Sequence, residues 1–113
     1  MRDIRFRAYD SANAKMIDWE FIKAHLIMPG HSSWEWMQYT DLKDKNGKEI
    51  YEGDVLSFRG QDILKVCWDK HHVCWLGEYI TNTSTMRDLF AFEWDKAEVI
   101  GNIYENPELL EAK

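Results

Sequence analysis

The sequence predicts an α+β fold dominated by β-strands, either a small bent sheet or a partly open barrel, with one or two short helices. Apolar and polar residues alternate in short stretches, as at 4–9 and 34–39, which is typical of half-buried strands. Three further stretches, 55–58, 63–68 and 73–79, are separated by four-residue turns and predict a β-meander. These observations together favour many short strands over a helical protein.

The turn between residues 43 and 49 is the strongest local signal. Asn46-Gly47 suits a tight type I′ turn, because both central positions of that turn need positive φ. A strict two-residue turn would place Lys45 opposite Lys48, and like charges across a strand pair are unfavourable. A longer loop from Asp44 to Lys48 is therefore equally supported.

Helical patterns are few. Apolar residues within 18–28 fall near helical spacing, which favours a short helix there. Thr85 resembles a helix N-cap and predicts a second helix that runs to about Trp94. Asn106 followed by Pro107 predicts one final helical turn, with Pro107 at the first helical position.

The length of 113 residues predicts one domain over residues 1–113. We expect 37–80 to form the central β-meander, with 1–17 and 98–110 as terminal strands that pack on it. The six tryptophans supply apolar surface for a real core. A chain this short cannot cover every large apolar face with one copy, so we also expect a homo-oligomer.

The net charge of −6 argues against bare duplex nucleic acid as a partner, since that binding depends on neutralising phosphates. No window is long and apolar enough to cross a membrane, so no membrane partner is expected. The N-terminus lacks the apolar core of a secretion signal. We therefore expect a cytoplasmic protein in which Cys67 and Cys74 are thiols.

Four clustered residues, Cys67, His71, His72 and Cys74, invite comparison with a zinc site. A turn over 69–72 would instead place Cys67 directly opposite Cys74 on paired strands. That arrangement favours two small buried cysteines and exposed turn histidines over a metal site. The sequence alone does not decide whether these residues bind metal.

No pattern for catalysis is present. The chain has no Ser-His-Asp order, no phosphate-binding glycine loop and no nucleophile motif. Carboxylates such as Glu49, Glu52 and Asp54 are close in sequence, but 20 acidic residues make such neighbours common by chance. We therefore predict that the protein is not an enzyme, with no catalytic residues, no metal and no cofactor.

A candidate interaction surface combines basic and aromatic side chains. Arg2, Arg5 and Arg7 form a basic patch at the N-terminus, whose simplest interpretation is a solvated strand face. Tryptophans beside the loop at 29–33 and near a sheet edge are the best candidates for exposure, although core packing is their usual role. The residues predicted for this surface are Arg5, Arg7, Trp34, Trp36 and Trp75.

Three blocks of sequence, Met1–Asp10, Gln38–Leu56 and Glu98–Leu110, resemble the YopX family, small proteins encoded by bacteriophages and by prophages of Gram-positive bacteria. One departure is Asp41, which stands where the family usually has glycine. If that position needs positive φ, Asp tolerates it less well than Gly. The resemblance implies a viral origin, action in the cytoplasm and self-association, but no activity and no catalytic residues.

Three hypotheses for function follow. The first is a non-catalytic phage or prophage accessory protein that binds a host or phage macromolecule, in particular a host protein with a basic surface. The alternative is a nucleotide or single-stranded nucleic-acid binder that uses exposed tryptophans beside the N-terminal arginines. The third is a hydrolase that uses clustered carboxylates and a metal ion.

Overall fold

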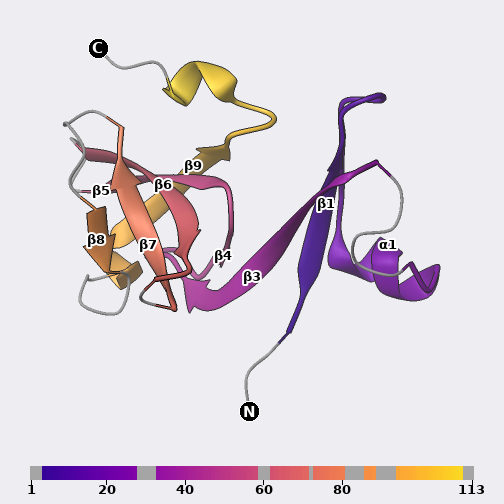
Figure 1. Ribbon diagram of the computed structural model, residues 1–113, viewed down its shortest axis with the longest axis horizontal. Coiled ribbons are helices and arrows are strands. Elements are labelled where there is room, and N and C mark those ends of the chain that lie inside the picture. Colours follow the sequence, from indigo (N-terminus) through magenta and orange to yellow (C-terminus); the bar gives the residue numbers. More distant parts are fainter. Residues whose placement is uncertain are drawn as a thin grey trace.

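The computed structural model describes residues 4–27, 33–58, 62–71, 73–80, 86–88 and 94–110. Two antiparallel sheets make up most of this part of the chain (Figure 1). The strands are β1 (Phe6–Asp10), β2 (Lys15–Ile17), β3 (Glu35–Lys43), β4 (Glu49–Tyr51), β5 (Asp54–Phe58), β6 (Asp62–Asp69), β7 (Cys74–Tyr79), β8 (Met86–Asp88) and β9 (Ala97–Asn102). The helices are α1 (Trp19–Ala24) and two 3-10 turns, η1 (Trp94–Lys96) and η2 (Pro107–Leu110).

The first sheet has the strand order β2-β1-β3-β4 and the second has β8-β7-β6-β5-β9. Strand β3 joins the two halves of the molecule, since its beginning pairs with β1 and its end with β4 (Figure 1). The second sheet contains the predicted meander, with β5, β6 and β7 paired in succession. The predicted β-rich fold with a short helix is therefore confirmed, and the sheets curve around two separate cores.

Strand β3 bends at Asp41. The register of β3 against β4 shifts between Tyr39 and Leu42, and Asp41 has φ 69°. The preceding Thr40 holds this bulge, because its hydroxyl donates to the Ile50 carbonyl at 2.7 Å and accepts from the Leu42 N–H at 3.2 Å. The position at which the resemblance implies glycine therefore does adopt the left-handed backbone that glycine prefers.

Replacing Asp41 with glycine should stabilise the protein. Asp41 is exposed, so the main effect is relief of the left-handed strain, partly offset by the greater freedom of glycine in the unfolded chain. We expect Asp41→Gly to raise the free energy of unfolding by about 0.5 kcal/mol, as measured by urea denaturation. Lys43→Gly, at an exposed position of β3 without positive φ, should lower it by about 1 kcal/mol. A loss of stability in both variants would contradict this explanation.

Each half of the molecule has its own core. Leu56, Leu64, Val66, Trp75 and Trp94 are among the buried residues of the second sheet's core. The core of the first sheet consists of Ala8, Ile17 and Ile22, with Ile22 contributed by α1. Helix α1 lies on the side of the first sheet that faces away from the second sheet (Figure 1).

The helix predicted over 18–28 is present as α1, and residue identity explains its start. Asp18 is the N-cap, and its carboxylate accepts from the Phe21 N–H at 2.9 Å.

The longer of the two loops predicted between β3 and β4, from Asp44 to Lys48, is also present. The Asp44 N–H donates to the Lys48 carbonyl at 2.9 Å, and Lys43 pairs with Glu49 just outside the loop.

The helix predicted from Thr85 to about Trp94 is wrong. Thr85 itself lies outside the described residues, but Met86–Asp88 forms strand β8, which pairs with β7. Trp94 begins the 3-10 turn η1 and is only 5% exposed. Strand pairing with β7 and burial of Trp94 in the second core outweigh the local capping signal, as tertiary contacts commonly do.

The predicted pairing of Cys67 with Cys74 is also wrong. Cys74 lies opposite Asp69, and Cys67 lies opposite Leu76. The turn includes Val73, which has φ 52°. This register places Trp68 opposite Trp75, where the two rings pack edge to face at 5.0 Å between centroids. The aromatic contact is worth about 1 kcal/mol and favours this register over the predicted one.

Candidate binding groove between the two sheets

One face of β1 contacts the second half of the molecule. Three alternate residues point to that side, as the two-residue period of a strand requires. Arg5 forms an ion pair with Glu49, and Arg7 forms one with Asp54. Tyr9 stacks on Tyr104, with 5.4 Å between ring centroids and 15° between planes. The contacts of Arg7 and Tyr9 tie the first sheet to β5 and to the turn after β9, whereas Arg5, which precedes β1, is paired with β4 of its own sheet.

The Arg7–Asp54 pair is the most buried of these contacts. The Arg7 side chain is 14% exposed and that of Asp54 only 1%. The Arg7 guanidinium also lies over the Tyr51 ring, 4.6 Å from its centroid. The second carboxylate oxygen of Asp54 accepts from the Tyr51 N–H at 2.7 Å. Burial raises the pKa of Asp54, although Arg7 and the Tyr51 N–H act in the opposite direction.

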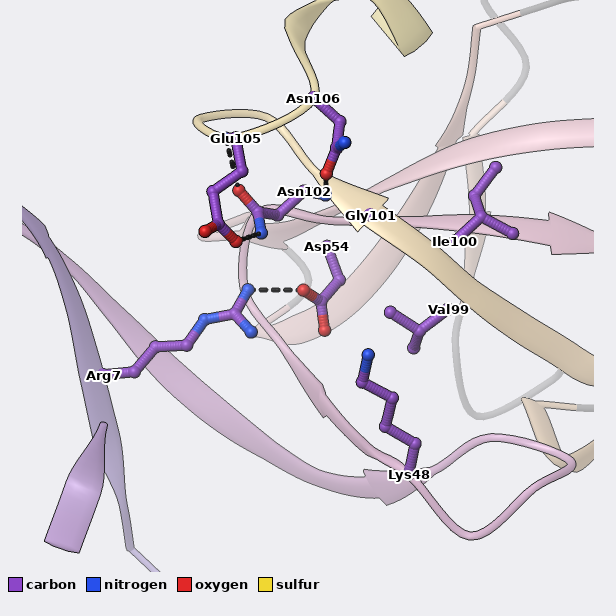
Figure 2. A pocket seen from close by; sticks show the side chains of 9 residues that line it. All are labelled: Arg7, Lys48, Asp54, Val99, Ile100, Gly101, Asn102, Glu105 and Asn106. Atoms are coloured by element: carbon purple, nitrogen blue, oxygen red, sulfur yellow. Dashed lines mark hydrogen bonds and ion pairs between the residues drawn. The ribbon is translucent and has the colours of Figure 1, made fainter. Parts of the chain in front are cut away.

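A groove of about 310 Å³ lies beside this ion pair (Figure 2). Arg7 reaches it from β1, Lys48 from the loop before β4, and Asp54 from β5, while β9 and the turn after it form the opposite wall. The three sequence blocks that resemble the YopX family meet here, since each contributes lining residues. The groove is therefore built by the parts of the chain that carry the resemblance.

The turn after β9 forms a rigid wall. The Asn102 side-chain oxygen accepts from the N–H groups of Tyr104 and Glu105, and its amide donates to the Glu105 carboxylate at 2.8 Å. Asn106 accepts from the Asn102 N–H at 3.2 Å through its side chain. A Cβ on Gly101 would lie 2.5 Å from the Asn106 side-chain oxygen, so a larger residue would have to displace the side chain that accepts from the Asn102 N–H. The predicted final helical turn follows as η2.

Lys48 places an exposed positive charge at the groove. Its side chain is exposed, and it forms no ion pair within the described residues. Figure 2 shows its ammonium on the side of the groove formed by Asp54 and Val99. Sequence reasoning missed Lys48, because an exposed lysine in a charged turn looks like any other surface lysine.

The structure separates the residues predicted for one interaction surface. Arg5 is paired with Glu49 of β4 and Arg7 with Asp54 of β5, so these two are not a solvated basic face, while Arg2 lies outside the described residues. Trp34 and Trp36 pack with the core of Ala8, Ile17 and Ile22 instead. Across β1 and β3, Trp36 lies opposite Ala8 and Met37 lies opposite Arg7. Residues that lie opposite each other share a face and neighbours in sequence alternate between faces, so the tryptophans and arginines lie on opposite faces of the first sheet.

The exposure predicted for Trp75 is wrong. Trp75 is 2% exposed and belongs to the core of the second sheet. The prediction treated β7 as a strand near an edge, but β8 pairs with it at Leu76–Glu78 and Trp75 faces the core. Among the described tryptophans Trp68 is the most exposed residue, at 40%.

Two further expectations concern metals and membranes. Among the described residues, which do not include His72, no group of three or more His, Cys, Asp and Glu side chains is placed to hold a metal ion. Burial and the nearby Glu78 raise the pKa of the Cys67 thiol. No helix in the described part of the chain is long and apolar enough to cross a membrane.

Comparison with known proteins identifies the family. The family described as "YopX protein" matches residues 27–111. The crystal structure of protein EF1440 from Enterococcus faecalis is similar over 98% of this chain and 100% of that chain, with a TM-score of 0.66 and 26% sequence identity. Comparison with curated proteins gave no match. Since the family match covers most of the 113 residues, this chain belongs to the YopX family.

Proposed function

We propose that this YopX-family chain is a non-catalytic accessory protein of a phage or prophage, and that it binds another protein in the cytoplasm of the bacterial host. One observation carries the proposal. The buried polar residues of the described part of the chain are Thr40, Asp44, Asp54 and Asn102, and every one of them holds backbone groups or an ion pair. None is available as an acid, base or nucleophile, which supports binding over catalysis.

The charges support a protein partner over a nucleic acid. The net charge is −6, and of the predicted basic patch the two described arginines, Arg5 and Arg7, are paired with Glu49 and Asp54. An acidic surface is complementary to a basic protein surface, and such complementarity raises association rates. The nucleotide or single-stranded nucleic-acid alternative has less support, because Trp34 and Trp36 lie on the face opposite Arg5 and Arg7. Self-association remains part of the proposal, on the grounds of aromatic content.

The groove can be tested as the contact site with a charge reversal. We expect affinity purification of the tagged chain from infected host cells, after nuclease treatment, to recover a specific protein partner. Lys48→Glu reverses the exposed charge in the groove and should reduce recovery of that partner at least tenfold, because the groove contact proposed here is with an acidic side chain of the partner's otherwise basic surface, and that side chain would then face a like charge. Lys70→Glu makes the same charge change in the exposed β6–β7 turn and should leave recovery unchanged.

Two outcomes would contradict the proposal. Recovery of nucleic acid alone before nuclease treatment, with no protein partner afterwards, would favour the alternative function. Equal recovery with Lys48→Glu and Lys70→Glu would exclude the groove as the contact site. Light scattering of the purified chain tests self-association separately, and a strictly monomeric protein would remove that part of the proposal.

A further inference from the structure

A second pocket, of about 300 Å³, lies beside the aromatic pair of the second sheet and is lined by Gln38, Glu52, Trp68 and Trp75. Trp68 and Trp75 are cross-strand partners on β6 and β7 and meet at 70° between ring planes. Trp75 is buried, while Trp68 is 40% exposed. The buried ring therefore fixes the exposed one, and an indole surface is presented to solvent in a defined orientation.

Glu52 is the charged residue that lines this pocket. Glu52 is half-buried, yet it forms no ion pair within the described residues. Burial raises the pKa of its carboxyl, and the Gln38 backbone N–H acts in the opposite direction. A partly desolvated carboxylate without a cation is costly for the folded protein, and a bound cation would offset that cost.

Glu52 is the charged residue among those that line the pocket. The nearby Lys65 of β6 is paired with Glu78 at 3.5 Å, on the face of β6 opposite to Trp68. A phosphate-bearing ligand such as a nucleotide would be repelled by Glu52, whereas a cation would be attracted.

We propose that this pocket receives an arginine side chain of the protein partner, with the guanidinium stacked on Trp68 and paired with Glu52. A guanidinium is planar, so it stacks on an indole, and its N–H groups form a fork that matches a carboxylate. The Gln38 side chain can accept one of the remaining N–H groups. An ammonium is a compact point charge that neither stacks nor forms a fork, so lysine fits the pocket less well. The identity of the partner as a protein rests on the proposed function.

The pocket can be tested without the partner. A short blocked peptide that contains one arginine is titrated into the purified chain, and indole fluorescence is followed. The matched peptide has citrulline, which keeps the planar shape but carries no charge. We expect saturable quenching by the arginine peptide, and binding of the citrulline peptide about tenfold weaker or more.

Two variants locate the binding. Glu52→Gln should weaken the arginine peptide about tenfold or more, because the charge-assisted hydrogen bonds are lost. It should fold at least as stably as the parent chain, since it removes a half-buried charge without a partner. Glu108→Gln makes the same change on the exposed η2 turn and should have no effect. Equal binding of arginine and citrulline, equal binding by both variants, or tighter binding of a lysine peptide would overturn the proposal.

This test separates the two proposals. If the parent chain recovers a protein partner from host cells but does not bind the arginine peptide, the pocket proposal fails and the proposed function stands. If the peptide binds but no protein partner is recovered, the proposed function fails although the pocket accepts a guanidinium. Quenching by guanosine monophosphate in place of the arginine peptide would overturn the pocket proposal in favour of base stacking.

Discussion

Replacing Arg7 with methionine is expected to lower the free energy of unfolding by about 3 kcal/mol or more, as measured by urea denaturation at pH 7. Methionine keeps much of the apolar stem but leaves the Asp54 carboxylate, 1% exposed, without its cation. A buried charge that has lost its partner must either stay desolvated or bind a proton, and both are costly. The contact over the Tyr51 ring is lost as well.

Arg5→Met is the matched control. Arg5 makes the same two kinds of contact, an ion pair with Glu49 and a position over the Tyr39 ring at 5.3 Å. Its pair is about one-third exposed on each side, so solvent screens it and the loss should be below about 1 kcal/mol. Combining Arg7→Met with Asp54→Asn should recover part of the stability. Similar losses in the two single variants would show that burial does not determine the value of these pairs.

The strand pattern was predictable because it depends on local alternation. The meander of β5, β6 and β7 follows from residues that alternate in sequence and therefore alternate between faces. The errors arose where a distant segment decides the outcome. The capping signal at Thr85 says nothing about the edge of β7 that β8 covers, and the turn composition at 69–72 does not reveal the Trp68–Trp75 contact that sets the register.

The site was predictable only in part, for a similar reason. Alternation correctly places Arg5 and Arg7 on one face of β1, but it cannot show what covers that face. Asp54 of the second sheet lies against Arg7, and the strand that joins the two halves, β3, has its bulge at Asp41. The resemblance to the family did mark Asp41 as a special backbone position. Burial of Trp75 and the exposure of Trp68 depend on strand order, which no local pattern reveals.

Asp44→Ala is expected to lower the free energy of unfolding by about 3 kcal/mol. Asp44 is 5% exposed, and its carboxylate accepts three backbone N–H groups at 2.9 Å, those of Asn46, Lys48 and Val99. It thereby closes the β3–β4 loop and fastens that loop to the edge of β9. Alanine leaves these N–H groups without acceptors, and an unsatisfied buried donor costs more than the net value of its bond. Urea denaturation at pH 7 measures the loss.

Asp10→Ala is the control for Asp44→Ala, because the Asp10 carboxylate also accepts three hydrogen bonds, from Ala12 and Asn13, but in an exposed turn. Water replaces those bonds, so Asp10→Ala should lower the free energy of unfolding by less than about 1 kcal/mol.

The pH dependence of stability provides a second check on Asp44. Burial by itself raises the pKa of Asp44, but the N–H groups of Val99, Lys48 and Asn46 outweigh it and lower the pKa below the ordinary 3.8. A carboxyl whose pKa is lowered on folding stabilises the protein above its unfolded pKa and loses that effect as the pH falls through the folded one. The stability difference between the parent chain and Asp44→Asn should therefore be constant near neutral pH and shrink below about pH 4. A difference that persists at pH 2 would show that charge on Asp44 contributes nothing, and that hydrogen-bond geometry alone holds the loop to β9.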